Sequence, residues 1–286
     1  MSVIGFDTSN YTTSIAFFDG KDGLNCSKLL PVKEGELGLR QSDAVFAHIK
    51  GLPELSGRLF SHVKVENITA IGVSTRPRAV EGSYMPCFMV GYSHAKLLAD
   101  TFGVPLIEVS HQQGHVAASL WSAGRLDLMD TPHLAWHLSG GTTDISAGQL
   151  IDRTGQLLNL PFPSGKHLDA LSKEAIGKTL FKVKCNGPEF SLSGVQNKVQ
   201  QFFESTGDAA ETAAYALRCV AYAVHKATEN ALLEYPGLPV VFSGGVASNS
   251  MLRELTADLD PIFSEPQYST DNAMGVAVLA HRMMEG

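Results

Sequence analysis

Two runs rich in β-branched and aromatic residues open the chain, and this start limits the possible folds more than any other feature. Val3–Asp7 and Thr13–Phe18 are separated by a short polar run, which predicts a β-hairpin. A comparable pair recurs at His133–Ser139 and Thr143–Ala147, on either side of a glycine pair. A chain that begins the same pattern twice is expected to fold into two related lobes.

After each hairpin, strand-like runs alternate with helical patterns, which is typical of an α/β fold with several parallel strands. The expected strands are Ile68–Ser74, Pro105–Ser110, Val240–Ser243 and Pro261–Phe263, and the expected helices are Phe88–Phe102, His115–Ala123, Ala209–Leu233, Asn249–Leu259 and Asn272–Met284. We predict domains at residues 1–120 and 121–286, with the last helix free to pack back on the N-terminal lobe. A cleft between two such lobes is the usual place for a small ligand.

Composition excludes several classes of protein. Apolar residues make up 44% and charged residues 18%, the profile of a compact globular chain. No stretch reaches the roughly 18 uncharged apolar residues of a membrane helix, and the first residues lack the basic flank of a signal peptide. The four cysteines include no C-x-x-C pair. We therefore expect a cytoplasmic protein with no membrane partner.

The net charge of −7 argues against an overall electrostatic attraction to nucleic acid. The charge is uneven, however. Residues 166–198 hold six lysines and three acids, a local +3, so the remainder of the chain sums to −10. This segment is either a solvated helix face or a local patch that binds phosphates.

His111 and His115 lie four residues apart, between an expected strand and an expected helix. Histidines at this spacing share one helical face, so both imidazoles can reach a single ion. The alternative is an ordinary pair of surface or hydrogen-bonded histidines. A zincin protease would have Glu directly after the first histidine as its general base, but the sequence has Gln112 there. Peptidase chemistry is therefore disfavoured.

A metal held by two histidines needs a further protein ligand, and Asp271 is the candidate. Its position just ahead of an apolar helix equally fits an ordinary N-cap. We predict a site for one divalent metal at His111, His115 and Asp271, and the cap remains the alternative role of Asp271.

Paired glycines follow two strand-like runs, at Leu138–Gly141 and at Ser243–Gly245. Glycine lets backbone amides approach a phosphate or a nucleoside, although a tight turn explains such a pair equally well. Asn249 can contact a ribose or a base edge, or cap the helix that follows.

Two acids, Asp152 and Asp169, flank a turn that contains Gly165. Gly165 permits close approach of a ligand, and carboxylates at such positions can accept hydrogen bonds from ribose hydroxyls. As isolated residues they would be ordinary surface acids.

Taken in order, these segments resemble the tRNA threonylcarbamoyltransferase family, once called O-sialoglycoprotein endopeptidase or glycoprotease. The matching pieces are Gly5-Phe6-Asp7-Thr8-Ser9, His111-x-x-Gly114-His115, Leu138-Ser139-Gly140-Gly141, Asp152-Arg153, Leu160–Gly165, Phe190-Ser191, Gly244–Asn249 with Leu252-Arg253, and Thr270-Asp271-Asn272-Ala273. They run in family order from end to end, and their joint occurrence is far more specific than any one motif.

The resemblance implies an actin-like ATPase fold, an α/β architecture with two ribonuclease-H-like domains around a nucleotide cleft. It implies iron or zinc at His111, His115 and Asp271. It also implies that ATP, ADP or threonylcarbamoyl-AMP is bound at Leu138, Ser139, Gly140, Gly141, Asp152, Gly165, Asp169 and Asn249.

Members of that family transfer a threonylcarbamoyl group from its adenylate to adenosine 37 of tRNA. We expect the same acyltransferase activity here, with the catalytic residues unassigned. The alternatives are a non-catalytic paralog that serves as a partner subunit, or a carbamoyltransferase that acts on a small molecule. The resemblance also implies contact with tRNA through partner subunits, and a homodimer or heterodimer through the N-terminal lobe.

The chain departs from the family pattern at three places. Two acids that usually follow the first Thr-Ser are Tyr11 and Thr12 here, and Thr142 stands where the family has histidine. A Gly-Pro-Gly turn appears as Arg76-Pro77-Arg78, whose guanidinium groups can bind a phosphate or a carboxylate, or be loop charges in solvent. These departures indicate a divergent, shorter paralog in which the ligand sites persist and the transfer machinery has changed.

Overall fold

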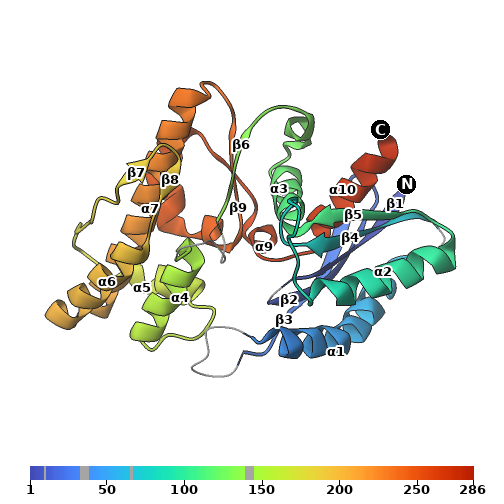
Figure 1. Ribbon diagram of the computed structural model, residues 1–286, viewed down its shortest axis with the longest axis horizontal. Helices are drawn as coiled ribbons and strands as arrows, with labels where there is room; N and C mark the ends of the chain where they lie inside the picture. Colours follow the sequence, from blue (N-terminus) through green and yellow to red (C-terminus); the bar gives the residue numbers. More distant parts are fainter. Residues whose placement is uncertain (10, 33–38, 65–66, 139–144) are drawn as a thin grey trace. The chain divides into compact units, whose positions relative to one another are not determined.

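A computed structural model of the protein divides into two compact units, and the chain passes between them twice. Unit 1 contains Met1–Met129 and Ser264–Gly286, and unit 2 contains Asp130–Phe263. The structure describes residues 1–9, 11–32, 39–64, 67–138 and 145–286 (Figure 1).

The boundaries differ from the expected division at residue 120. The helix α3 (His111–Ser122) continues past that point and packs along α10 (Met274–Glu285), so both belong to unit 1. The last helix therefore lies in the unit formed by the first half of the chain.

Unit 1 is built on a five-stranded mixed sheet in the order β3-β2-β1-β4-β5. The strands are β1 (Ser2–Thr8), β2 (Thr12–Phe18), β3 (Gly23–Leu29), β4 (Ile68–Arg76) and β5 (Leu106–Ser110). The first three form antiparallel hairpins, and β4 and β5 run parallel to β1. The carboxyl ends of β1, β4 and β5 therefore meet at one edge of the sheet.

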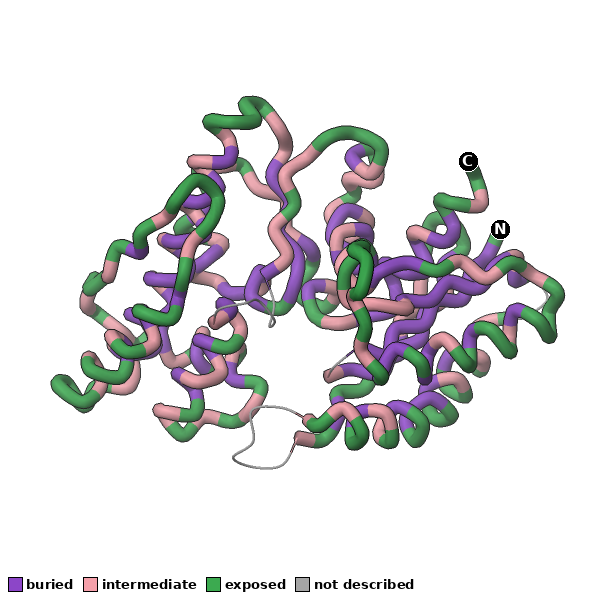
Figure 2. The backbone as a smooth tube through the Cα atoms, viewed as in Figure 1, coloured by how far each residue is buried: buried purple, intermediate pink, exposed green. Residues whose placement is uncertain are grey.

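Helices cover both faces of this sheet (Figure 1). On one face lie α1 (Gln41–Phe60) and α2 (Phe88–Phe102), and on the other lie α3 and α10. The described part of unit 1 also contains the helical turn α9 (Pro266–Ser269), and η2 (Leu126–Asp130) lies at its boundary with unit 2. Because both faces are covered, the central strand β1 is buried at every residue and its neighbours β2 and β4 are mostly buried, as Figure 2 shows.

Side chains alternate between the two faces along the central strands, so the position of a residue in its strand determines which helices it packs against. Ile4 and Phe6 of β1 pack in the same apolar cluster as residues of α1 and α2, whereas Val3 packs with residues of α10. Side chains two residues apart share a face. Asp7 therefore lies on the face covered by α3 and α10, and so does Ser74 of β4, which hydrogen-bonds to it.

Two glycines allow α3 and α10 to cross at short range. A Cβ atom added to Gly275 would overlap the carbonyl group of Gly114 and lie 2.8 Å from the backbone nitrogen of Ala118. Only a residue without a side chain fits at such a crossing. The close contact brings the start of α3 beside the segment that precedes α10.

Unit 2 contains a parallel three-stranded sheet, in the order β10-β9-β6, among helices. Its elements are β6 (Leu134–His137), α4 (Ala147–Leu157), α5 (Gly165–Ser172), β7 (Cys185–Asn186), β8 (Glu189–Phe190), α6 (Ser193–Thr206), α7 (Ala209–Glu234), β9 (Val240–Ser243), η3 (Gly245–Ser248), α8 (Ser250–Leu255), η4 (Ala257–Leu259) and β10 (Ile262–Phe263). The long helix α7 contributes many alanines and valines to the core.

The second expected hairpin is wrong in its described part. Residues 143–147 were predicted to be a strand, but Ala147 opens α4 and Ser146 is the N-cap. The Ser146 hydroxyl accepts from the Gln149 amide at 3.2 Å, and the Gln149 side chain accepts from the Ser146 amide at 3.2 Å. This capping box stabilises a helix start at a place where the residue types alone suggested a strand.

Among the helices that the structure describes, none is both long enough and apolar enough to span a membrane.

Candidate metal centre

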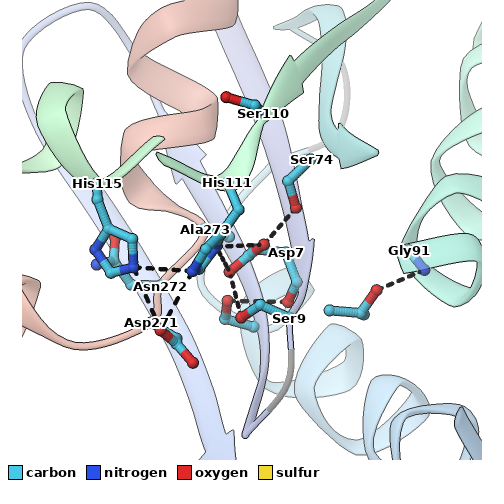
Figure 3. Close-up of polar contacts among 12 residues, drawn as sticks. Asp7, Ser9, Ser74, Gly91, Ser110, His111, His115, Asp271, Asn272 and Ala273 are labelled. Carbon is cyan, nitrogen blue, oxygen red and sulfur yellow. Dashed lines mark hydrogen bonds and ion pairs between the residues drawn. The ribbon is translucent and has the colours of Figure 1, made fainter. Parts of the chain in front are cut away.

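Three side chains predicted to hold a metal converge within unit 1. The Nε2 atoms of His111 and His115 are 3.0 Å apart, and Oδ1 of Asp271 lies 3.4 Å from the first and 3.3 Å from the second. Figure 3 shows the two rings and the carboxylate directed at one another. Over the described residues, this is the one group of three or more His, Cys, Asp or Glu side chains close enough to share an ion.

The start of α3 fixes the two histidines. Ser110 ends β5 and caps the helix, accepting from the Gln113 amide at 3.2 Å while the Gln113 side chain accepts from the Ser110 amide at 2.9 Å. His111 is thus the first helical residue and His115 follows one turn later, on the same face. Gln112, which stands where a zincin protease has its glutamate, is followed by Gln113, whose backbone amide and side chain form this cap.

Asp271 does not take its alternative role as the N-cap of α10, because the N-cap residue is Ala273 and the side chain that bonds to the first helical amide is that of Asn272. Oδ1 of Asn272 accepts from the Met274 amide at 3.1 Å, and the Asn272 side-chain amide donates to the carbonyl groups of Thr270 at 2.7 Å and Tyr268 at 3.0 Å. Asn272 therefore stabilises the helix start, and the carboxylate of Asp271 is directed at the histidines.

Asp7 is a fourth member of the centre that the sequence analysis did not assign to the site. Its side chain is fully buried, and Nδ1 of His111 lies 3.2 Å from Oδ1 and 3.1 Å from Oδ2. Ser9 donates to Oδ2 at 3.1 Å, and Ser74 donates to Oδ1. A carboxylate that orients a metal-binding imidazole from its far side is a common supporting group. The signal was an acid at the end of an otherwise apolar buried strand.

While no metal is bound, charges within the centre favour the protonated, cationic form of His111, and a metal ion would replace the proton on Nε2. Burial lowers the pKa of His111, but Asp7 and Asp271 outweigh burial and raise the pKa to about 10. Burial lowers the pKa of His115, and the charge on His111 lowers it further. Burial raises the pKa of Asp271, yet its hydrogen bonds to both histidines hold that pKa well below the usual range. The centre thus offers a carboxylate and a neutral imidazole.

The three donor atoms fit a divalent ion. Ligands about 2.0 to 2.1 Å from zinc at tetrahedral angles are separated by about 3.3 Å, close to the 3.0, 3.3 and 3.4 Å separations found here. Two imidazoles and one carboxylate suit zinc, and the same set with open positions suits non-haem iron. His111, His115 and Asp271 would be the ligands, with Asp7 behind His111.

The residues predicted to bind a nucleotide lie in unit 2. Leu138, Asp152, Gly165, Asp169 and Asn249 are described, whereas Ser139, Gly140 and Gly141 lie outside the described residues, as does Thr142. Leu138 is buried beside β9, donating its amide to the Ser243 carbonyl at 2.8 Å.

The alternative role of Asn249 is present in the structure. Its Oδ1 accepts from the Leu252 amide at 3.0 Å, so Asn249 caps α8. Its side-chain amide donates to Oδ1 of Asp169 at 2.8 Å, and the same oxygen accepts from the amide and the hydroxyl of Ser250, both at 2.9 Å. Asp169 and Asn249 thus join α5 to α8, and nucleotide binding by them stays a prediction.

Asp152 stands apart from these two residues. Its Oδ1 accepts from the Ser164 amide at 2.8 Å, and burial raises its pKa. Among the described residues, no hydrogen bond engages its Oδ2. Gly165, the first residue of α5, follows Ser164 directly.

The lysine-rich segment of unit 2 is largely a solvated surface. Lys166, Lys178, Lys182 and Lys184 are exposed. Lys173 pairs with Asp169 at 3.5 Å, and the ammonium group of Lys198 lies 4.4 Å from the centre of the Phe181 ring.

Comparison with known proteins decides the family. The model of the family TsaD, tRNA N6-adenosine threonylcarbamoyltransferase, matches residues 38–278. The chain belongs to this family. The tRNA N6-adenosine threonylcarbamoyltransferase of Carboxydothermus hydrogenoformans is 31% identical over 318 residues, which cover 99% of this chain and 93% of the relative. The resemblance read from the sequence motifs is therefore confirmed.

Solved structures identify the fold of this threonylcarbamoyltransferase-family chain. HypF from T. kodakarensis has a TM-score of 0.65 at 15% identity, with 100% of this chain and 48% of HypF covered. Component A of the Acidaminococcus fermentans (R)-2-hydroxyglutaryl-CoA dehydratase has a TM-score of 0.57 at 14% identity, with 100% of both chains covered. The predicted α/β, actin-like ATPase fold is confirmed.

Proposed function

We propose that this protein transfers a threonylcarbamoyl group from its adenylate to adenosine 37 of tRNA. The observation that supports this most strongly is the cluster of His111, His115 and Asp271, oriented by the buried Asp7, in a chain of the threonylcarbamoyltransferase family. The residues that catalyse the transfer remain to be assigned among those that touch the substrates.

A divalent metal at this centre would hold the carbamoyl oxygen and stabilise the negative charge that develops on it during transfer. The protein's contribution is orientation. Asp7 keeps Nδ1 of His111 engaged, so Nε2 of that ring is directed at His115 and Asp271. A ligand set held in this way requires little rearrangement when the substrate arrives.

Adenylate binding is proposed for unit 2, and Asp152 is its best-supported residue. One carboxylate oxygen of Asp152 holds the Ser164 amide beside Gly165, so the other can accept from a ribose hydroxyl. ATP or ADP would use the same adenosine contacts. The exposed lysines of the same unit are a candidate contact for tRNA phosphates.

The transfer is tested by incubating zinc- or iron-loaded protein with threonylcarbamoyl-adenylate and unmodified tRNA, with and without related subunits. Mass spectrometry of the digested tRNA should detect threonylcarbamoyladenosine. His115→Ala should lose tightly bound metal and lower the rate about 100-fold or more, whereas His62→Ala, at an exposed position of the same unit, should change neither. Absence of the modified nucleoside in every combination would sink the proposal.

A second function, that of a non-catalytic partner subunit, is favoured by one surface of unit 1. Phe46 and Ile49 on α1, and Met89 and Leu97 on α2, are exposed, and the two helices contact each other on one face of the sheet. Several exposed apolar side chains on two neighbouring helices are typical of an interface with another protein. The replacement of two family acids by Tyr11 and Thr12 is consistent with this role.

This second function predicts a dimer, with a second copy or a related subunit, that depends on the α1 and α2 surface. Leu97→Glu should shift native mass spectra and sedimentation from dimer to monomer, because a carboxylate would be desolvated at the interface. The control is Leu233→Glu, at an exposed position on α7 in unit 2. A wild-type protein that stays monomeric both alone and with its relatives rules the partner role out.

A further inference from the structure

The turn Arg76-Pro77-Arg78 is hydrogen-bonded to the start of α3, next to the candidate metal centre. Arg76 is the last residue of β4 and pairs with Ser110 of β5, the residue before His111. The amide of Gln112, the residue after His111, donates to the Pro77 carbonyl at 3.1 Å. The backbone on both sides of a predicted metal ligand is thus joined to this turn.

The far side of the turn is held as well. The Arg78 amide donates to the Ser83 hydroxyl at 2.9 Å, and the Ser83 amide donates to the Val80 carbonyl at 3.2 Å. These bonds use backbone groups of the turn and leave both guanidinium groups available.

Arg76 differs from every other half-buried arginine in the described parts of the chain. The other four bond to protein acceptors, in the pairs Arg125 with Asp127, Arg153 with Gln196, Arg218 with the Thr179 carbonyl and Arg253 with the Ala247 carbonyl. The guanidinium group of Arg76 makes no hydrogen bond or ion pair with any described residue, and Arg76 as a whole residue is half-buried. Its donors are therefore available to a ligand that supplies acceptor oxygens.

The charges around the candidate metal centre indicate which kind of ligand group the Arg76 guanidinium would bind. Asp7 and Asp271 place two carboxylates at the edge of the sheet where the turn lies. A divalent ion at the centre would only balance these two charges, so a further positive charge close by would be needed to attract an anionic group of the substrate. A guanidinium group suits this role because its planar donors match the two oxygens of a carboxylate or a phosphate.

We propose that Arg76, with Arg78 beside it, binds an oxyanion of the acyl donor next to the metal centre, and so selects donors that carry this charge. The inference rests on the proposed transfer reaction, whose donor has a carboxylate on its threonyl group and a phosphate in its adenylate. It adds a specificity-determining subsite in unit 1, separate from the adenosine contacts proposed for unit 2.

The test measures binding by calorimetry with the zinc-loaded full-length protein. The probes are a stable sulfonamide analogue of threonylcarbamoyl-adenylate with its carboxylate, the same analogue with that carboxylate converted to an amide, AMP, and adenosine. The variants are Arg76→Ala, Arg76→Lys and the control Arg58→Ala, which removes an exposed arginine of the same unit.

If the threonyl carboxylate is bound, the wild type and Arg58→Ala should prefer the acid analogue over the amide by about tenfold or more, Arg76→Ala should lose that preference, and Arg76→Lys should recover part of it. If the phosphate is bound, the same pattern should appear for AMP over adenosine. Arg76→Ala protein that retains both preferences overturns the proposal, and so does a wild type that shows neither. Wild-type protein with an Arg76-dependent preference and no modified tRNA would contradict the transfer reaction and leave this subsite standing.

Discussion

At the scale of single residues, the candidate metal centre depends on a carboxylate that would not itself touch the ion. Asp7 is buried at the end of β1, where Ser9, Ser74 and the imidazole of His111 bond to its oxygens. The contact of Nδ1 with Asp7 and the contact of Nε2 with Asp271 together hold the His111 ring in its orientation. The geometry of the ligands therefore comes from β1 as much as from α3.

Asp7→Asn should lower the affinity for zinc or iron about 10- to 100-fold, because the neutral amide accepts less strongly from Nδ1 of His111. A chelator competition measures the affinity, and circular dichroism checks the fold. The control is Asp22→Asn, an exposed acid of the same unit. Equal metal affinity of wild type and Asp7→Asn would show that Asp7 does not support the centre.

A buried histidine outside the candidate metal centre makes stability depend on pH. His48 of α1 is fully buried and bonds through Nδ1 to the Thr13 hydroxyl at 2.8 Å, and burial lowers its pKa. Its ordinary value is about 6.5. Because the unfolded chain takes up the proton more readily, the stability that His48 contributes is present above pH 6.5 and is lost as the pH falls below that value.

The free energy of unfolding of the wild type, minus that of His48→Gln, should therefore decrease between pH 7 and pH 5. Urea titrations of metal-free protein at several pH values provide the measurement. His62→Gln, an exposed position just beyond α1, serves as the control, and its difference should stay flat. A flat difference for His48→Gln would contradict the assignment.

At the scale of secondary structure elements, the crossing of α3 and α10 determines whether the ligands can meet. His111 and His115 come from α3, whereas Asp271 comes from the segment ahead of α10, so the contact of Gly114 with Gly275 sets the distance between them. If α10 packed slightly farther from α3, the carboxylate of Asp271 would be out of reach of both imidazole rings.

Gly275→Ala should lower the free energy of unfolding by about 1 to 3 kcal/mol, because its methyl group overlaps the Gly114 carbonyl. It should also weaken metal binding. The matched control is Gly57→Ala in α1, where an added Cβ meets nothing within 4 Å. The free energy of unfolding of that variant should be about 0.5 to 1 kcal/mol higher than that of the wild type, because alanine reduces the backbone entropy of the unfolded chain. Denaturant unfolding distinguishes them, and equal stabilities would refute the steric argument.

At the scale of the whole molecule, the two units differ in how the chain builds them. Unit 2 is continuous, whereas unit 1 needs Ser264–Gly286 to complete it. Helix α10 covers one face of the central sheet of unit 1 through residues that include Ala277 and Ala280, both fully buried. Removal of Ser264–Gly286 would expose apolar strands and delete Asp271 as well.

A fragment of residues 130–263 should therefore unfold cooperatively, because it keeps one continuous apolar core. A fragment of residues 1–129 should lack cooperative unfolding and bind no metal tightly. Thermal unfolding by circular dichroism and metal analysis of both fragments are the measurements. A folded, metal-binding 1–129 fragment would show that α10 and Asp271 are dispensable.

Local sequence patterns predicted much of this protein correctly. The first hairpin and the strand Val240–Ser243 were predicted, and the helix Phe88–Phe102 was predicted with its observed bounds, because alternation, apolar runs and helix formers act over a few residues. The family was also recognisable, since its motifs occur in order. The capping box at Ser146 was readable as well, and overlooking it led to the wrong strand there.

The tertiary structure decided how distant residues combine. Spacing placed His111 and His115 on one helical face, but only the packing of α10 on α3 brings Asp271 within 3.4 Å, and only the pleat of β1 directs Asp7 to the same place. That Asp271 faces the histidines and does not cap α10 likewise depends on the tertiary structure, and its role as a metal ligand stays a prediction. Such contacts join positions more than 100 residues apart, and no local pattern contains them, because side-chain direction depends on which faces the sheet and helices bury.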